Sequence, residues 1–133
     1  MICRTILIDS SFWINEARQQ RDPVKTLLAA SHLHELAICG VIRAEVGRGI
    51  KNPIALNRLQ AFWDVMIYAQ TDHQLWNETE KLLWSLDRRG VIIPLSDAVI
   101  ACCALRLQAV LLTLDHHFEA IPGLKTIRSV NEL

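Results

Sequence analysis

The sequence lacks a surplus of charge of either sign. Its 133 residues include 14 Lys and Arg and 14 Asp and Glu, so the formal net charge at neutral pH is zero. The composition therefore does not indicate a broadly basic nucleic-acid-binding protein, although a local basic patch suffices for such binding. Charged residues make up only 21% of the chain and hydrophobic residues 51%, which argues against disorder and provides for a buried core.

The sequence also lacks an apolar run of the about 20 residues that a membrane span requires, and Arg106 interrupts the best candidate. Four cysteines occur without any C-x-x-C pair: Cys3, Cys39, Cys102 and Cys103. We expect these cysteines to be reduced thiols in the core. Repeats, linkers and a visible signal peptide are lacking as well. These features predict a soluble, cytoplasmic protein with a single domain over residues 1–133.

Short apolar segments alternate with segments of helical character. The predicted strands are residues 4–9, 35–40, 65–70, 109–115 and 124–130, and the predicted helices are residues 10–20, 22–33, 41–50, 52–63, 72–90 and 96–108. Several of the strands are continuously apolar. Strands of this kind, separated by helices, are typical of an α/β fold whose parallel sheet is covered on both faces.

Two helices carry local features with consequences for the fold. Ser10 or Ser11 is expected to cap the first helix. Residues 72–90 form the clearest amphipathic pattern, with a glycine at the end of the helix. The apolar stripe of this helix includes Trp76 and Trp84, which we therefore expect in the core.

Four acids fall at one edge of the predicted sheet. Asp9 closes the first strand, Asp115 follows the "VLLTL" segment, Asp97 begins the helix after "VIIPL", and Glu45 lies in the helix after "LAIC". Taken singly, each acid has a structural explanation in a turn, a cap or a helix. Ligands of open α/β sheets, however, bind outside the carboxyl ends of the strands. The four acids together predict an acidic pocket there.

Carboxylates that share a pocket raise one another's pKa unless a cation compensates them. Oxygen ligands without a set of thiols or imidazoles favour Mg²⁺ or Mn²⁺ over Zn²⁺. Such an ion suits phosphodiester hydrolysis, because it activates the attacking water and stabilises the charge that develops on phosphate. His116 and His117 are expected to be solvated residues of a turn, since neighbouring side chains there diverge.

The segments "ILIDSSFWIN", "VIRAEVGRGI", "PLSDAVIACCAL" and "LLTLDHHFEAIPGL", in this order, resemble a PIN domain, and more narrowly the ribonuclease toxins of VapBC toxin–antitoxin pairs. The resemblance covers essentially the whole chain. It implies a three-layer α/β/α sandwich around a central parallel sheet of about five strands. It also implies that Asp9, Glu45, Asp97 and Asp115 line one catalytic pocket. Asp9, Asp97 and Asp115 would be the ligands of Mg²⁺, with Mn²⁺ as a substitute.

Further residues match by position near these acids. The hydroxyls of Ser11 and Thr113 are suited to orient a carboxylate or a metal-bound water, although capping or turn formation explains them too. Arg43 and Arg48 are candidates for contacts with substrate phosphates at the rim of the pocket. Solvation on a helix surface explains the two arginines equally well.

The resemblance implies a metal-dependent endoribonuclease with an RNA substrate, a cognate antitoxin and a homodimeric assembly. A basic antitoxin segment with an Arg among the acids would suit the acidic pocket. Helices that carry tryptophan, including Trp13 and Trp63, are candidates for either the core or the dimer contact. The alternatives are a phosphatase of haloacid dehalogenase type, a phospho-acceptor receiver and a non-catalytic PIN-like binding module. The phosphatase normally has a second Asp where this chain has Ser11, and Lys125 is poorly placed for the receiver's lysine.

Overall fold

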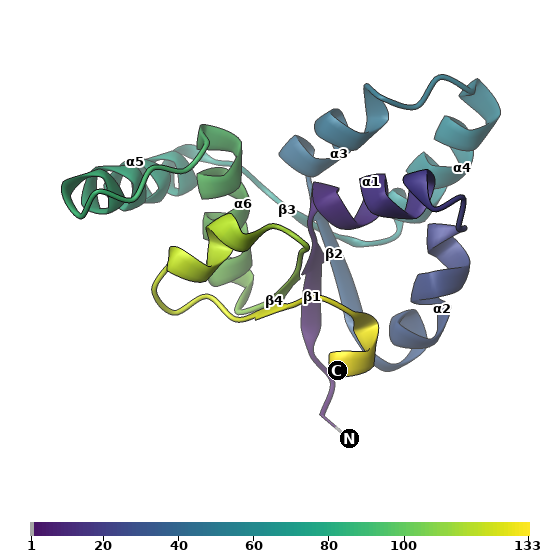
Figure 1. Ribbon diagram of the computed structural model, residues 1–133. Helices are drawn as coiled ribbons and strands as arrows, with labels where there is room; N and C mark the ends of the chain where they lie inside the picture. Colours follow the sequence, from purple (N-terminus) through teal and green to yellow (C-terminus); the bar gives the residue numbers. More distant parts are fainter. Residues whose placement is uncertain (1) are drawn as a thin grey trace.

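The computed structural model of the protein describes residues 2–133 (Figure 1). The elements in chain order are β1 (Thr5–Ile8), α1 (Ser10–Arg18), α2 (Pro23–Leu33), β2 (Glu35–Cys39), α3 (Gly40–Gly47), α4 (Pro53–Asp64), β3 (Ile67–Ala69), α5 (His73–Arg88), α6 (Leu95–Leu107), β4 (Val110–Leu112), the 3₁₀ helix η1 (His116–Ala120), β5 (Thr126–Ile127) and the 3₁₀ helix η2 (Val130–Glu132). The predicted alternation of strands and helices is confirmed, and the strands are shorter than expected.

The five strands form one parallel sheet in the order β3-β2-β1-β4-β5. In the central strand β1, Leu7 pairs with Ala37 of β2 on one side and with Leu111 of β4 on the other. All three residues are completely buried. Helices cover both faces of the sheet, which explains why these strands show no alternation of apolar and polar residues.

The helices complete a three-layer sandwich, as expected. Helices α1, α2 and α4 lie on one side of the sheet, and α5 and α6 lie on the other (Figure 1). Helix α3 follows β2 and contacts both α1 and α6. Helix α6 is buried over seven consecutive residues, 98–104, in keeping with its apolar character on most faces.

The tryptophans divide differently from the prediction. Trp13 and Trp63 are buried, with their rings packed edge to face at a centroid distance of 5.8 Å, so both belong to the core. On α5, by contrast, Trp76 is 44% exposed and Trp84 is 62% exposed, so the expected core positions are wrong. Helix α5 packs mainly on α6 and extends away from the sheet (Figure 1), so α6 covers only part of its apolar stripe.

The cysteines follow the prediction with one exception. All four are free, and Cys39, Cys102 and Cys103 are buried. Cys3 is exposed, because it precedes the first strand, and its expected place in the core is wrong. None of the helices in residues 2–133 combines the length and the apolar composition of a transmembrane span.

Candidate functional site

The strand order changes direction between β1 and β4, whose carboxyl ends lie side by side. From β1 the sheet continues to β2 and β3 on one side and to β4 and β5 on the other, and ligands bind at such a switch point in open α/β sheets. Asp9 directly follows β1, and Thr113 directly follows β4. The backbone N–H of Asp9 donates to the carbonyl of Leu112 at 2.9 Å, which holds the two strand ends together.

Asp9 is buried, and two hydroxyls fix its side chain. Its Oδ2 accepts hydrogen bonds from Ser11 Oγ at 2.7 Å and from Thr113 Oγ1 at 2.8 Å. Oδ2 also accepts from the backbone N–H of Ser11, so Asp9 caps α1, and the expected cap at Ser10 or Ser11 is wrong. Within the described residues all hydrogen bonds to this carboxylate end on Oδ2, which leaves Oδ1 available to a cation.

The same hydroxyls fix the loop after β4. Thr113 Oγ1 accepts from the backbone N–H of Asp115 at 3.0 Å, and Ser11 Oγ accepts from the backbone N–H of Leu114 at 3.0 Å. Ser11 and Thr113 thus connect the first acidic segment of the sequence to the last. They contact Asp9 directly, which is the position expected of groups that orient a metal-binding carboxylate.

Glu45 reaches the site from α3, and its main partner is a residue that sequence reasoning missed. Ser10 Oγ donates to Glu45 Oε1 at 2.7 Å. The buried Ser10 follows Asp9 directly, so β1 and α1 position two of the four acids through consecutive residues. Gly47 is the last residue of α3 and Gly49 lies beyond its end, so neither glycine interrupts the helix.

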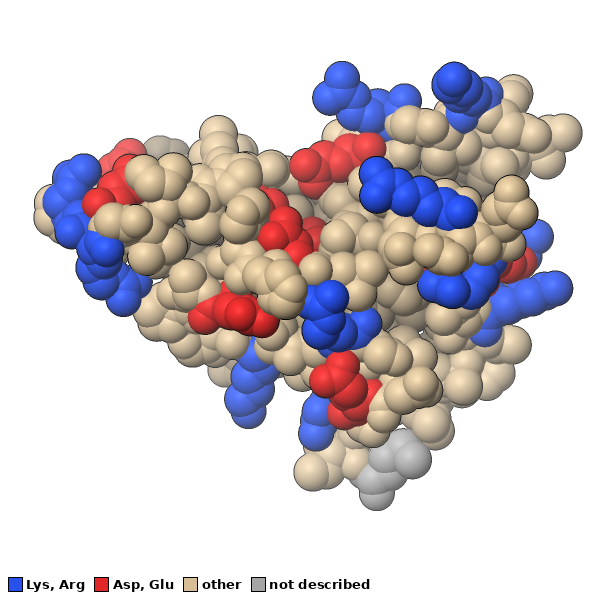
Figure 2. Space-filling model, viewed as in Figure 1, with Lys and Arg blue, Asp and Glu red and all other residues tan. Residues whose placement is uncertain are grey.

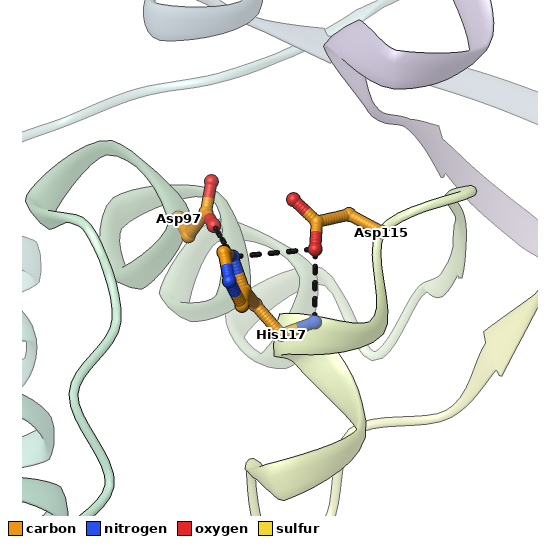
Figure 3. Close-up of side chains that lie close together, drawn as sticks. All are labelled: Asp97, Asp115 and His117. Carbon is orange, nitrogen blue, oxygen red and sulfur yellow. Dashed lines mark hydrogen bonds and ion pairs between the residues drawn. The ribbon is translucent and has the colours of Figure 1, made fainter.

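Asp97 and Asp115 meet through an imidazole (Figure 3). His117 Nδ1 lies 3.1 Å from Asp97 Oδ2 and 3.2 Å from Asp115 Oδ1. Asp97 stands in the first turn of α6, and Asp115 caps η1 by accepting from the backbone N–H of His117 at 2.9 Å. The expectation of a merely solvated His117 is therefore wrong. His116 does diverge from it and contacts Glu119 at 3.1 Å.

The four acids receive little cationic compensation. Among residues 2–133, no Lys or Arg forms an ion pair with any of them. Burial, with the charges of Asp115 and Asp9, raises the pKa of Asp97, although the hydrogen bond with His117 opposes this shift. The same hydrogen bond, with the charge of Asp115, raises the pKa of His117. Figure 2 shows acidic side chains in the middle of this face, with Lys and Arg mostly around them.

The two candidate arginines lie on another side of α3. Arg43 Nη1 contacts Asp64 at 2.7 Å, and its guanidinium stacks on the ring of Trp63. Arg43 and Arg48 line a separate pocket of about 490 Å³ between α3, α4 and β3. Arg43 is two residues from Glu45, and helical residues two apart do not share a face.

An apolar groove begins beside Glu45. It has a volume of about 660 Å³ and lies between α1, α2, α3 and α4, and we call it the α1–α4 groove. Its apolar lining includes Trp13, Ile14, Ala17, Val46, Ile50 and Leu59. Glu45 belongs to the lining too, so the groove leads from the outer helices to the acidic site.

The donor set fits a hard divalent cation. Ligand atoms of Asp97, Asp115 and His117 all lie within 4.8 Å of one another, and Asp9 contributes a nearby negative charge and a free oxygen. A set made mainly of carboxylate oxygens favours Mg²⁺ or Mn²⁺. Neutralising these clustered charges would also relieve the repulsion between them.

Comparisons with known proteins agree with this architecture. A family model of the PIN domain matches residues 6–124, and the chain belongs to the PIN domain family. No curated protein matches it in sequence.

Solved structures of VapBC proteins share the fold. A chain of VapBC2 from Rickettsia felis, bound to a DNA fragment from its promoter, gives a TM-score of 0.77 at 20% identity over 92% of this chain and 97% of that one. A chain of VapBC-1 from nontypeable Haemophilus influenzae gives a TM-score of 0.74 at 20% identity, over 92% of this chain and 96% of that one. A chain of DNA-bound VapBC from Salmonella typhimurium gives a TM-score of 0.74 at 20% identity, over 95% of this chain and 98% of that one.

Proposed function

We propose that this protein is a Mg²⁺-dependent endoribonuclease and the toxin of a type II toxin–antitoxin pair, acting in the cytoplasm. The observation that carries the proposal is the cluster of Asp9, Glu45, Asp97 and Asp115 at the carboxyl edge of the sheet. Within residues 2–133, no Lys or Arg forms an ion pair with any of these four acids. Membership of the PIN domain family and the likeness to VapBC chains support the class of activity.

Each residue has a defined task in this proposal. Asp9, Asp97 and Asp115 would hold the cation, and Ser11 and Thr113 keep Asp9 in one orientation. The cation would supply Lewis-acid stabilisation to an RNA phosphodiester under attack by water. In the hydrolysis, the water oxygen loses a proton and bonds to phosphorus, the ester P–O bond breaks, and the leaving ribose oxygen takes up a proton to become a hydroxyl.

Glu45 has a different task from the three Asp residues. Ser10 holds its Oε1, and its Oε2 accepts no hydrogen bond within the described residues. In this proposal, Oε2 takes the proton that the attacking water loses. Ser11 also stands where a phosphatase of haloacid dehalogenase type has its second acid, and its hydroxyl is bound to Asp9, which disfavours that alternative.

The α1–α4 groove is the proposed site of the antitoxin. An apolar groove suits the apolar face of a helical peptide. A basic side chain at the end of that peptide would meet Glu45 and the neighbouring acids, which would block the site by charge pairing. The similar solved structures are of VapBC bound to DNA, which supports an antitoxin as the partner class.

The exposed side of α5 is the proposed homodimer contact. Trp84 and Trp76 leave large apolar surfaces uncovered on a helix that extends from the body of the molecule (Figure 1). A two-fold contact between two copies of α5 would bury both residues.

Cleavage assays with defined cations test the activity. Purified protein incubated with structured RNAs should cleave them in Mg²⁺ or Mn²⁺ and should stop when a chelator removes the ion. The Asp97→Asn protein, purified in the same way, controls for a contaminating nuclease. Undiminished cleavage in excess chelator contradicts the metal-dependent mechanism.

A further inference from the structure

We propose that His117 is itself a ligand of the divalent cation and strengthens the binding of Mn²⁺ more than that of Mg²⁺. This inference rests on the proposed function, because it specifies the chemistry of the same metal site. The residue lies on η1, two residues after its capping residue Asp115, and its imidazole is directed at both Asp97 and Asp115 (Figure 3).

The spacing of the donor atoms supports direct coordination. Metal–ligand bonds of about 2.1 Å place neighbouring ligands of an octahedral ion about 3 Å apart. His117 Nδ1 lies 3.1 Å from the Asp97 oxygen and 3.2 Å from the Asp115 oxygen, which matches two such neighbouring pairs. The two carboxylate oxygens lie within 4.8 Å of each other, a range that includes neighbouring positions on the same ion.

The backbone holds the imidazole at this place. The N–H of His117 donates to Asp115 Oδ1, the same oxygen that lies beside the imidazole nitrogen. One ligand of the cation thus fixes the residue that carries the next. Because the His117 side chain is 52% exposed, no packed group obstructs a small adjustment of the ring.

The alternative is that His117 only balances charge and leaves when a cation arrives. The two roles predict opposite effects of removing the imidazole. A departing imidazole competes with every divalent cation, so its removal should tighten the binding of Mg²⁺ and Mn²⁺ alike. A coordinating imidazole favours the transition metal, because Mg²⁺ prefers oxygen ligands and retains its waters. Its removal should then weaken mainly the binding of Mn²⁺.

The test compares metal binding by the wild type, His117→Ala and the matched control His116→Ala. His116 is the adjacent residue of the same turn and contacts Glu119 rather than the acids. Isothermal titration with Mn²⁺ and Mg²⁺ should show Mn²⁺ affinity reduced by about tenfold or more in His117→Ala, with Mg²⁺ affinity little changed. Pulsed electron paramagnetic resonance of bound Mn²⁺ should detect imidazole nitrogen in the wild type and His116→Ala, and not in His117→Ala.

The outcomes separate this inference from the proposed function. Mn²⁺ bound to the wild type without nitrogen coupling, or bound more tightly by His117→Ala, overturns coordination by His117 and leaves the metal site in place. Failure of the wild type to bind either cation overturns the metal-dependent function as well. Thermal melts of the three metal-free proteins establish that each is folded.

Discussion

The negative charge of Asp97 has opposite effects on activity and on stability: it is proposed to bind the cation, and in the metal-free protein it is repelled by the neighbouring acids. Replacing Asp97 by Asn keeps the shape of the side chain and removes one negative charge from the cluster. Because Asp97 is a proposed metal ligand, we expect RNA cleavage to fall about a hundredfold or more, which corresponds to about 2.7 kcal/mol of activation free energy. RNA cleavage rates in Mg²⁺ measure this effect.

The same substitution should not lower the stability of the metal-free protein. Burial and the charges of Asp115 and Asp9 raise the pKa of Asp97, so the folded protein binds this proton more tightly than the unfolded chain does. The free energy of unfolding of the metal-free wild type should therefore fall as pH rises from the ordinary carboxyl pKa to the raised one. Asp97→Asn should lack this fall and, at neutral pH in chelator, melt no lower than wild type. A destabilised but fully active variant would show that Asp97 is only a helix-start residue.

Thr113 offers a second test at this scale, because two substitutions separate its hydroxyl from its shape. Thr113→Val keeps the volume but removes the hydrogen bond to Asp9 and the acceptor for the N–H of Asp115. We expect metal affinity to drop by about tenfold or more, with a loss of about 1–3 kcal/mol in unfolding free energy. Thr113→Ser, which retains the hydroxyl, should restore most of the metal affinity. Calorimetric Mn²⁺ titration distinguishes the pair, and equal affinities would remove Thr113 from the site.

The acids could be predicted from sequence because the ends of parallel strands share one edge, whereas their partners could not. Asp9 and Asp115 each follow an apolar strand, and this position alone predicts that they lie at the carboxyl edge of the sheet. His117 contacts Asp97 across 20 residues of sequence, and a turn with two histidines does not indicate which one faces inward. Ser10 contacts Glu45 across 35 residues, and a serine beside a helix start suggests a cap before it suggests such a contact.

Among the elements, the periodicity of α5 predicted that the segment is a helix but not how much of the helix would be covered by neighbouring elements. Its buried positions, Leu75, Thr79 and Leu86, follow the helical period as expected. Trp76 and Trp84 belong to the same broad stripe, but α6 packs against only part of it. When the apolar stripe of a helix is wider than the area that one neighbouring helix covers, part of the stripe stays exposed. The number of neighbouring elements cannot be predicted from the pattern of the helix itself.

The four elements around the α1–α4 groove give a prediction about the partner. Ala17 is an exposed position of α1 in the lining of the groove. Ala17→Glu would place a charge in the apolar lining without disturbing the core. We expect the variant to keep wild-type cleavage and melting temperature but to lose antitoxin binding and the inhibition that follows from it.

Co-expression with the proposed antitoxin, followed by size-exclusion chromatography and cleavage assays, measures both effects. Leu28→Glu, at an exposed position of α2 outside the groove lining, is the matched control and should bind normally. Normal inhibition of Ala17→Glu would place the antitoxin on another surface.

At the scale of the whole molecule, the switch in strand order at β1 accounts for the position of the site. The alternation of apolar strands and helices predicted a parallel sheet, and the carboxyl-edge rule then predicted where its ligand would bind. The order of the strands did not follow from the pattern, because each short strand is equally suited to either neighbour. Only the pairing of β1 with both β2 and β4 brings Asp9 beside Thr113 and the loop that carries Asp115.

The assembly of two whole molecules is tested on α5. We expect a homodimer by light scattering at micromolar concentration, and we expect Trp84→Glu to convert it to a monomer. The substitution removes an exposed ring, and the new carboxylate can pair with Arg88 one turn later, so the helix should persist. Ile54→Glu on α4 is the control, because Ile54 is 79% exposed and lies on the other side of the sheet (Figure 1). A monomeric wild type would contradict the dimer, and a dimeric Trp84→Glu protein would place the contact on a surface other than α5.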